Sequence, residues 1–184
     1  MRVAFLIFIL CALVGWTASK NFSLKDDRVM VEAYDGRMYL VRDVPTKKDT
    51  ADMMAALNAK VLFLLRQMKQ SGAKPVMVAR LVQRYRPEVL AEGRIHKKLT
   101  SYTVNKGERV VLCMRSRDAD SLYPENVLFS VLLHELAHVA SLSEGHGDEF
   151  NENLGILTKE AETAGLLRRE KVELDYCGIP LLSV

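Results

Sequence analysis

The sequence predicts an α+β domain with a mostly antiparallel sheet, a buried central helix and an apolar N-terminal helix. Three observations support this class: strand-like alternation at residues 28–45, helical periodicity at residues 49–71, and a helix-length apolar segment at residues 124–142. The 184 residues suit one compact domain. The net charge is only +3, and Lys and Arg are interspersed with Asp and Glu, so a nucleic-acid partner is not indicated.

The first element is an uncharged apolar segment between Arg2 and Lys20. Its length, about 17 residues, is at the lower limit for a helix that spans a bilayer. The basic start and the small residues at its end are also typical of a secretory signal. We expect residues 1–19 to be a signal peptide or membrane anchor, with a buried core helix as the alternative. The protein is then predicted to be membrane-associated or secreted, to contact a membrane through this segment, and to fold over residues 20–184.

The next segment, "RVMVEAYDGRMYLVRDVP", predicts a β-hairpin. Its residues alternate on both sides of Asp35-Gly36, a dipeptide that favours a two-residue type I′ turn, and Pro45 ends the second strand. A helix is expected from Asp49 to about Ser71, where Gly72 gives a stop signal. Its apolar residues recur at helical spacing: Met54, Leu57, Val61, Leu64, Leu65 and Met68.

A second helix is expected to start at Pro75, and its several arginines are interpreted as a solvated face. Residues 99–104 and 108–115, joined by Asn105-Lys106-Gly107, predict a second hairpin. The segment "PENVLFSVLLHELAHVASL" is apolar on nearly every side, so we expect a buried helix. A turn around His146 follows, then a helix that Asp148 can cap, and an extended closing segment at residues 172–184.

The chemistry of this sequence is concentrated in "HELAHVASLSEGHGDEF". His134 and His138 are four residues apart, which places both imidazoles on one face of a helix at a spacing suited to one Zn²⁺ ion. Glu135 is offset by one position, where it can accept a proton from a metal-bound water. Without a metal, burying these three polar side chains together would cost several kcal/mol. The pattern therefore favours a metal site over a core helix that carries histidines.

A catalytic zinc needs a third protein ligand and an open position for water. His146 is the leading candidate, because Gly145 permits the chain reversal that would bring it back to the helix. Glu160 and Glu162 in the following helix are the alternatives. The remaining histidine, His96, is interpreted as a solvated residue.

Two cysteines fall in the folded part of the chain, Cys113 and Cys177. They can pair in an oxidising compartment, but two cysteines do not make a disulfide framework. The default interpretation is two small buried hydrophobic residues.

The stretch "GERVVLCMRSRDADSLYPENVLFSVLLHELAHVASLSEGHGDEF" resembles the WLM-type metallopeptidases, which are related to the SprT-like group. The segments "YLVRDVP", "TSYTVNKGE" and "DYCG" resemble small WLM-like proteins of large DNA viruses. The resemblance implies a small zincin-like domain in which His134, His138 and His146 are zinc ligands and Glu135 is the catalytic base. For a viral protein, the expected location is a host membrane or the virion. Cellular relatives that act on DNA-crosslinked proteins carry basic or partner-binding tails, and no such tail is recognised in these 184 residues, so we do not expect that substrate class here.

The sequence thus predicts a zinc metallopeptidase that hydrolyses a protein or peptide substrate. The strand at residues 109–115 is expected to be the sheet edge along which an extended substrate binds. The alternative is a metal-stabilised binding or structural protein, in which Cys113 or Asp148 would complete a closed zinc site. A third possibility is a metal-dependent hydrolase of a non-peptide amide or ester.

Overall fold

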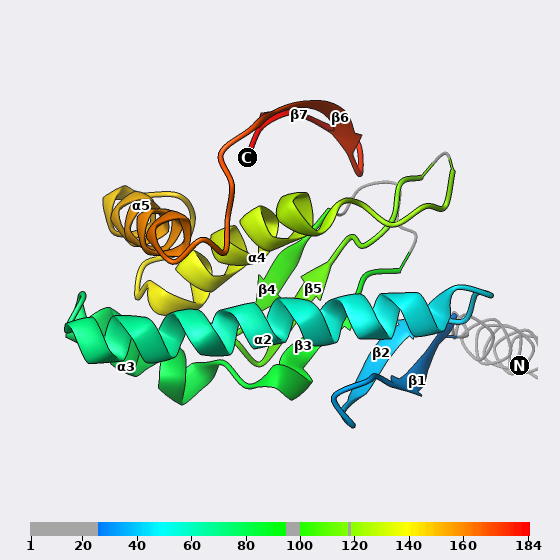
Figure 1. Cartoon of the computed structure of the whole chain (residues 1–184), viewed down its shortest axis with the longest axis horizontal. Coiled ribbons are helices and arrows are strands. Elements are labelled where there is room, and N and C mark those ends of the chain that lie inside the picture. Colours follow the sequence, from blue (N-terminus) through cyan, green and yellow to red (C-terminus); the bar gives the residue numbers. More distant parts are fainter. Residues whose placement is uncertain (1–25, 95–99, 118) are drawn as a thin grey trace, which may run out of the picture.

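The computed structural model describes residues 26–94, 100–117 and 119–184, and Figure 1 shows their arrangement. The predicted leader at residues 1–19, its N-terminal apolar helix and His96 lie outside these residues. The elements in chain order are β1 Arg28–Glu32, β2 Met38–Arg42, α2 Lys47–Ser71, α3 Pro75–Arg84, the 3₁₀ turn Pro87–Val89, β3 Leu90–Glu92, β4 Tyr102–Val104, β5 Arg109–Leu112, α4 Glu125–Ala140, α5 Asp148–Thr163, β6 Lys171–Tyr176 and β7 Ile179–Ser183. The predicted α+β class is confirmed.

The five-stranded sheet has the order β1-β2-β3-β5-β4 and is mixed. Both predicted hairpins form, because β1 pairs with β2 and β4 with β5 in antiparallel register. Between them, β2, β3 and β5 run parallel. Strand β3 was not predicted, and its three residues follow α3 closely in an arginine-rich segment. The sheet is therefore less antiparallel than the sequence suggested.

The first hairpin turns through three residues, which corrects the predicted two-residue type I′ turn. The Ala33 amide donates to the Arg37 carbonyl at 2.9 Å, so Tyr34, Asp35 and Gly36 form the loop. Gly36 has φ of 76°, whereas Asp35 is not in the left-handed region. A type I′ turn requires positive φ at both central residues, while one left-handed glycine suits the three-residue hairpin loop.

Helix α4 lies at the centre of the domain and packs against α2, α3, α5, β4 and β5. This environment explains why its sequence is apolar on nearly every side. Leu132, Leu133 and Leu136 have no exposed surface. The burial fixes the helix, and with it the direction of the side chains on its one open face.

The closing segment forms an antiparallel hairpin, β6–β7, apart from the main sheet. In Figure 1 it lies on one side of α4, and α2 lies on the other. A disulfide between Cys113 and Cys177 ties the hairpin to the end of β5, which corrects the interpretation of two unpaired cysteines. The Tyr176 hydroxyl also donates to the Cys113 carbonyl at 2.9 Å, and the Tyr123 hydroxyl to the Asp175 carbonyl at 2.7 Å.

The predicted membrane, transmembrane and signal assignments are corrected by the structure. Across residues 26–94, 100–117 and 119–184, no helix combines the length and the apolar character that a membrane span requires. The predicted membrane-associated or secreted localisation is withdrawn on this finding.

Candidate metal centre

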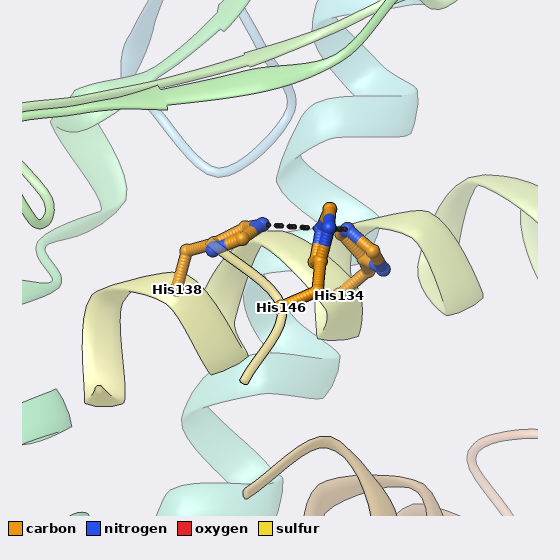
Figure 2. A group of neighbouring side chains, drawn as sticks. All are labelled: His134, His138 and His146. Atoms are coloured by element: carbon orange, nitrogen blue, oxygen red, sulfur yellow. Dashed lines mark hydrogen bonds between the residues drawn. The ribbon is translucent and has the colours of Figure 1, made fainter. Parts of the chain in front are cut away.

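Three histidine side chains meet on the open face of α4. His134 and His138 project from neighbouring turns of the helix, and His146 reaches them from the loop between α4 and α5, as Figure 2 shows. The Nε2 atom of His146 lies 3.1 Å from Nε2 of His134 and 3.1 Å from Nε2 of His138. The ligand atoms of all three lie within 4.8 Å of one another, so the group can hold a metal ion.

The geometry of the three nitrogens fits one shared cation better than hydrogen bonds. A tetrahedral zinc with Zn–N bonds of about 2.0–2.1 Å places its nitrogen ligands roughly 3.3 Å apart. His146 Nε2 has one lone pair or one proton, so it cannot make good hydrogen bonds to both neighbours at once. A cation accepts a lone pair from each of the three nitrogens. The donor set is therefore chemically suited to zinc.

The pKa shifts also favour the metal-binding form of the helix histidines. Burial, followed by the charges of His138 and His146, lowers the pKa of His134 to about 4. Burial is also the main cause that lowers the pKa of His138. Both imidazoles are consequently neutral near pH 7, which is the state in which a histidine nitrogen can bind a metal.

The loop that carries His146 is held by Glu149 in the first turn of α5. Its Oε2 accepts hydrogen bonds from the amides of Leu142 and Ser143 at 2.9 and 3.0 Å. Its other oxygen pairs with Arg80 of α3 at 2.9 Å. The backbone hydrogen bond to Ser143 is the largest cause of a pKa near 2 for Glu149. Gly145 has φ of 74°, which confirms the expected role of glycine in this reversal.

The arginines of α3 are structural, which corrects their interpretation as a solvated face. Arg80 donates to the Ala140 carbonyl and Arg84 to the Val139 carbonyl, each at 2.8 Å. These carbonyls belong to the last turn of α4, where intrahelical donors are missing and cations are favourable. Helix α3 thus stabilises the end of the helix that presents His138.

Phe150 forms the floor of the histidine cluster. Its side chain is 2% exposed, and its ring centroid lies 4.9, 4.3 and 4.6 Å from the rings of His134, His138 and His146. Asp148 is the first residue of α5 and makes no side-chain cap; the N-cap position is Gly147, contrary to expectation. This start of α5 places Phe150 against all three imidazoles.

Glu135 lies beside the cluster, with its carboxylate held by the edge strand. The Thr103 hydroxyl of β4 donates to Glu135 Oε2 at 2.9 Å. Burial raises the pKa of Glu135 to about 7, and the Thr103 hydrogen bond acts in the opposite direction. A carboxylate with a pKa near the operating pH is suited to both accepting and returning a proton. Sequence reasoning missed Thr103, because no local pattern connects it with a residue 32 positions away.

His134, Glu135, His138 and His146 line a common cleft of about 780 Å³ between α4, β4 and the β6–β7 hairpin. The alternative ligands are not part of the metal-binding group that the described residues form. Glu162 pairs with Arg169 instead, and Cys113 is held in the disulfide. The structure thus brings together the three predicted histidines and none of the alternatives.

The sheet edge beside this cleft is β4, which corrects the predicted substrate strand. Strand β5, which contains Val110 and Leu112, lies between β3 and β4. Its backbone is therefore paired on both sides. Among the residues that the structure describes, Tyr102–Val104 of β4 pair on one side only.

A sheet packed on a buried His-Glu-x-x-His helix, with a third histidine in the following loop, defines a metallopeptidase-type fold. The family model of the WLM domain matches residues 37–172, and the chain therefore belongs to the WLM domain family. An uncharacterized protein of Acanthamoeba polyphaga mimivirus is 27% identical over 187 residues, with 97% of this chain and 93% of that protein covered. An uncharacterized protein of Invertebrate iridescent virus 3 is 45% identical over 80 residues, or 43% of this chain and 50% of that protein.

The crystal structure of Wss1 from Saccharomyces cerevisiae has a similar fold, with a TM-score of 0.50 and 23% identity. The match covers 68% of this chain and 90% of that chain. These comparisons confirm the resemblance to the WLM family and to proteins of large DNA viruses.

Proposed function

We propose that this protein is a zinc-dependent metallopeptidase with His134, His138 and His146 as zinc ligands and Glu135 as the general base. The observation that supports it most is the convergence of three imidazole nitrogens beside a buried carboxylate in one cleft. Membership of the WLM family and the Wss1-like fold are consistent with this activity.

Zinc bound by the three histidines would polarise the scissile carbonyl and lower the pKa of a bound water towards 7. Glu135 takes the proton from the attacking water and returns it to the leaving amine. The Thr103 hydroxyl donates to the Glu135 carboxylate and holds it in place. Phe150 excludes water from beneath the histidines and fixes their rings.

The free side of β4 is the proposed binding edge for an extended substrate. Its backbone groups on that side have no strand partner among residues 26–94, 100–117 and 119–184, so they can hydrogen-bond to a peptide, as in other cases of strand addition. Thr103 lies in the middle of this strand, so a peptide paired there passes next to Glu135. This arrangement favours a peptide over a small amide or ester as the substrate.

The test compares the parent protein with Glu135→Gln, after zinc loading, on a pool of unstructured peptides. We expect Glu135→Gln to bind one zinc ion per chain and to lose peptide cleavage by a factor of at least about 10². Glu144→Gln is the matched control, because this carboxylate also lines the cleft while its side chain is 90% exposed. Cleavage by Glu135→Gln at the parent rate would refute the assigned base.

The ligand set is tested separately by His146→Ala. We expect weaker zinc binding, measured by competition with a chromogenic chelator, since one of three protein ligands is lost. Unchanged zinc affinity would show that His146 is not the third ligand. Stoichiometric zinc in the parent without any peptide cleavage would instead support the metal-stabilised binding protein.

A further inference from the structure

The cleft around the histidines has two chemically different sides. The β4 side is polar and includes Ser101, Thr103 and Asn105. The part built by α4, α5, the segment after α5, and β7 is mainly apolar. Its apolar members are Val131, Leu154, Leu167, Ile179, Leu181 and Val184, and its polar members are Ser130, Thr158 and Ser183.

The apolar side begins directly beside the proposed catalytic groups. Val131 precedes His134 by three residues and Glu135 by four, so the three side chains share one face of α4. Leu154 of α5 and Leu181 of β7 line the same cleft and are partly buried. A group that contacts Val131 would therefore lie about one helical turn from the base.

The charged side chains Lys106, Glu135 and Glu144, which line the cleft, already have polar partners. Lys106 and Glu144 pair with each other at 3.2 Å, in the loops near His138. Glu135 accepts the hydrogen bond of Thr103. An ionised side chain packed against Val131, Leu154 and Leu181 would lose part of its hydration to apolar surface, which is costly.

The hairpin that supplies Leu181 is fixed against the domain. The Cys113–Cys177 disulfide joins it to the segment after β5. The Tyr176 hydroxyl lies 2.8 Å from the Ser101 hydroxyl, which connects the hairpin with the segment leading into β4. The apolar wall and the polar edge strand are thus held at a set separation before any substrate binds.

We propose that the β6–β7 hairpin, through Leu181 together with Val131 and Leu154, makes this protein select peptides with a bulky apolar side chain beside the scissile bond. The inference rests on the proposed function, since it assigns a peptide to the cleft. An extended peptide on β4 directs alternate side chains to opposite sides. One of them faces the apolar wall, where its burial is favourable.

The probes are three labelled Ala/Ser-based decapeptides that differ only in a single central residue, Leu, Ser or Asp. Binding is measured by fluorescence anisotropy on zinc-loaded Glu135→Gln protein, and cleavage of the same peptides is measured with the parent. We expect the Leu peptide to bind at least about tenfold more tightly than the Ser peptide, with the Asp peptide weakest.

Leu181→Ser, made in the Glu135→Gln background, should reduce the Leu-over-Ser ratio to about threefold or less. Leu182→Ser is the matched control, because Leu182 is the next residue of the same strand, is 68% exposed and is not among the cleft residues. The control should keep the full ratio. Leu154→Ser provides the same test from α5, should the hairpin tolerate no change.

The outcomes separate the two proposals. Equal binding of the Leu and Ser peptides, or an unchanged ratio in both Leu181→Ser and Leu154→Ser, would overturn the selectivity even if the parent cleaves every peptide. Selective binding that depends on Leu181, with no cleavage by the parent, would support the apolar subsite and overturn the proposed hydrolysis.

Discussion

The packing of Phe150 against the three histidines predicts that one apolar substitution weakens metal binding without removing a ligand. Phe150→Ala removes a ring that is 2% exposed and contacts all three imidazoles. Truncation of a buried phenylalanine costs about 3–5 kcal/mol of unfolding free energy. The histidine rings also lose the surface that sets their orientation.

The matched control is Phe129→Ala. Phe129 is also fully buried in this domain, but its ring lies beneath Lys60, whose Nζ is 5.1 Å from the ring centroid. Both variants should lose about 3–5 kcal/mol in the metal-free state. Only Phe150→Ala should also lose zinc affinity, by about 10–100-fold, the range seen when groups that orient metal ligands are removed.

Urea unfolding of the metal-free proteins measures the loss of unfolding free energy. Chelator competition measures the loss of zinc affinity. The extra stability conferred by a fixed zinc concentration should shrink by about 1.4 kcal/mol for each tenfold loss of affinity. If Phe150→Ala does not fold, Phe150→Leu keeps the comparison with Phe129→Leu. Equal zinc affinities for the two folded variants would show that the ring does not organise the site.

Three further predictions follow from the contacts around the site. Glu149→Gln should weaken zinc binding, because the loop that carries His146 loses its charged acceptor; unchanged affinity would contradict this. The folded-state pKa of Glu149 is depressed to about 2 from 4.5, so its contribution to stability is present above pH 4.5 and is lost as the pH falls towards 2. The chemical shift of the Ser143 amide should follow this titration in the parent but not in Glu149→Gln. Gly107→Ala should lower the unfolding free energy by about 1–3 kcal/mol, because φ of Gly107 is 116° and an added Cβ would lie 3.1 Å from the Arg84 carbonyl oxygen. Gly155→Ala is the control, because a Cβ added at Gly155 meets no atom within 4 Å. Reduction of the Cys113–Cys177 disulfide, which spans 64 residues, should lower the unfolding free energy by up to about 4 kcal/mol, and no change in the urea midpoint would argue against the bond.

Local sequence patterns predicted the elements that depend on local interactions. The α2 helix, its end at Gly72 and the start of α3 at Pro75 were all predicted, because periodicity and backbone preference act over a few residues. Both hairpins of the main sheet were predicted for the same reason. The three-residue loop at Gly36 differs from the expected turn, since Asp-Gly dipeptides suit more than one hairpin geometry.

Local sequence patterns could not predict which strands pair when those strands are far apart in the chain. Strand β3 has three residues and pairs parallel to β2 and β5, without a connecting turn that would mark it. Its insertion places β5 in the interior and leaves β4 at the edge. The edge strand beside the cleft is therefore β4, the neighbour of β5, which the sequence had predicted to bind the substrate.

By itself, the sequence determined which side chains could bind a metal, because two histidines and a glutamate on one helix turn are a local property of spacing. Tertiary structure decided that His146, not Glu160 or Glu162, joins them. It also placed Thr103 against Glu135, and it placed Leu181 in the lining of the same cleft. These contacts join elements that are far apart in the chain, and they arise only when packing of the buried core fixes the elements relative to one another.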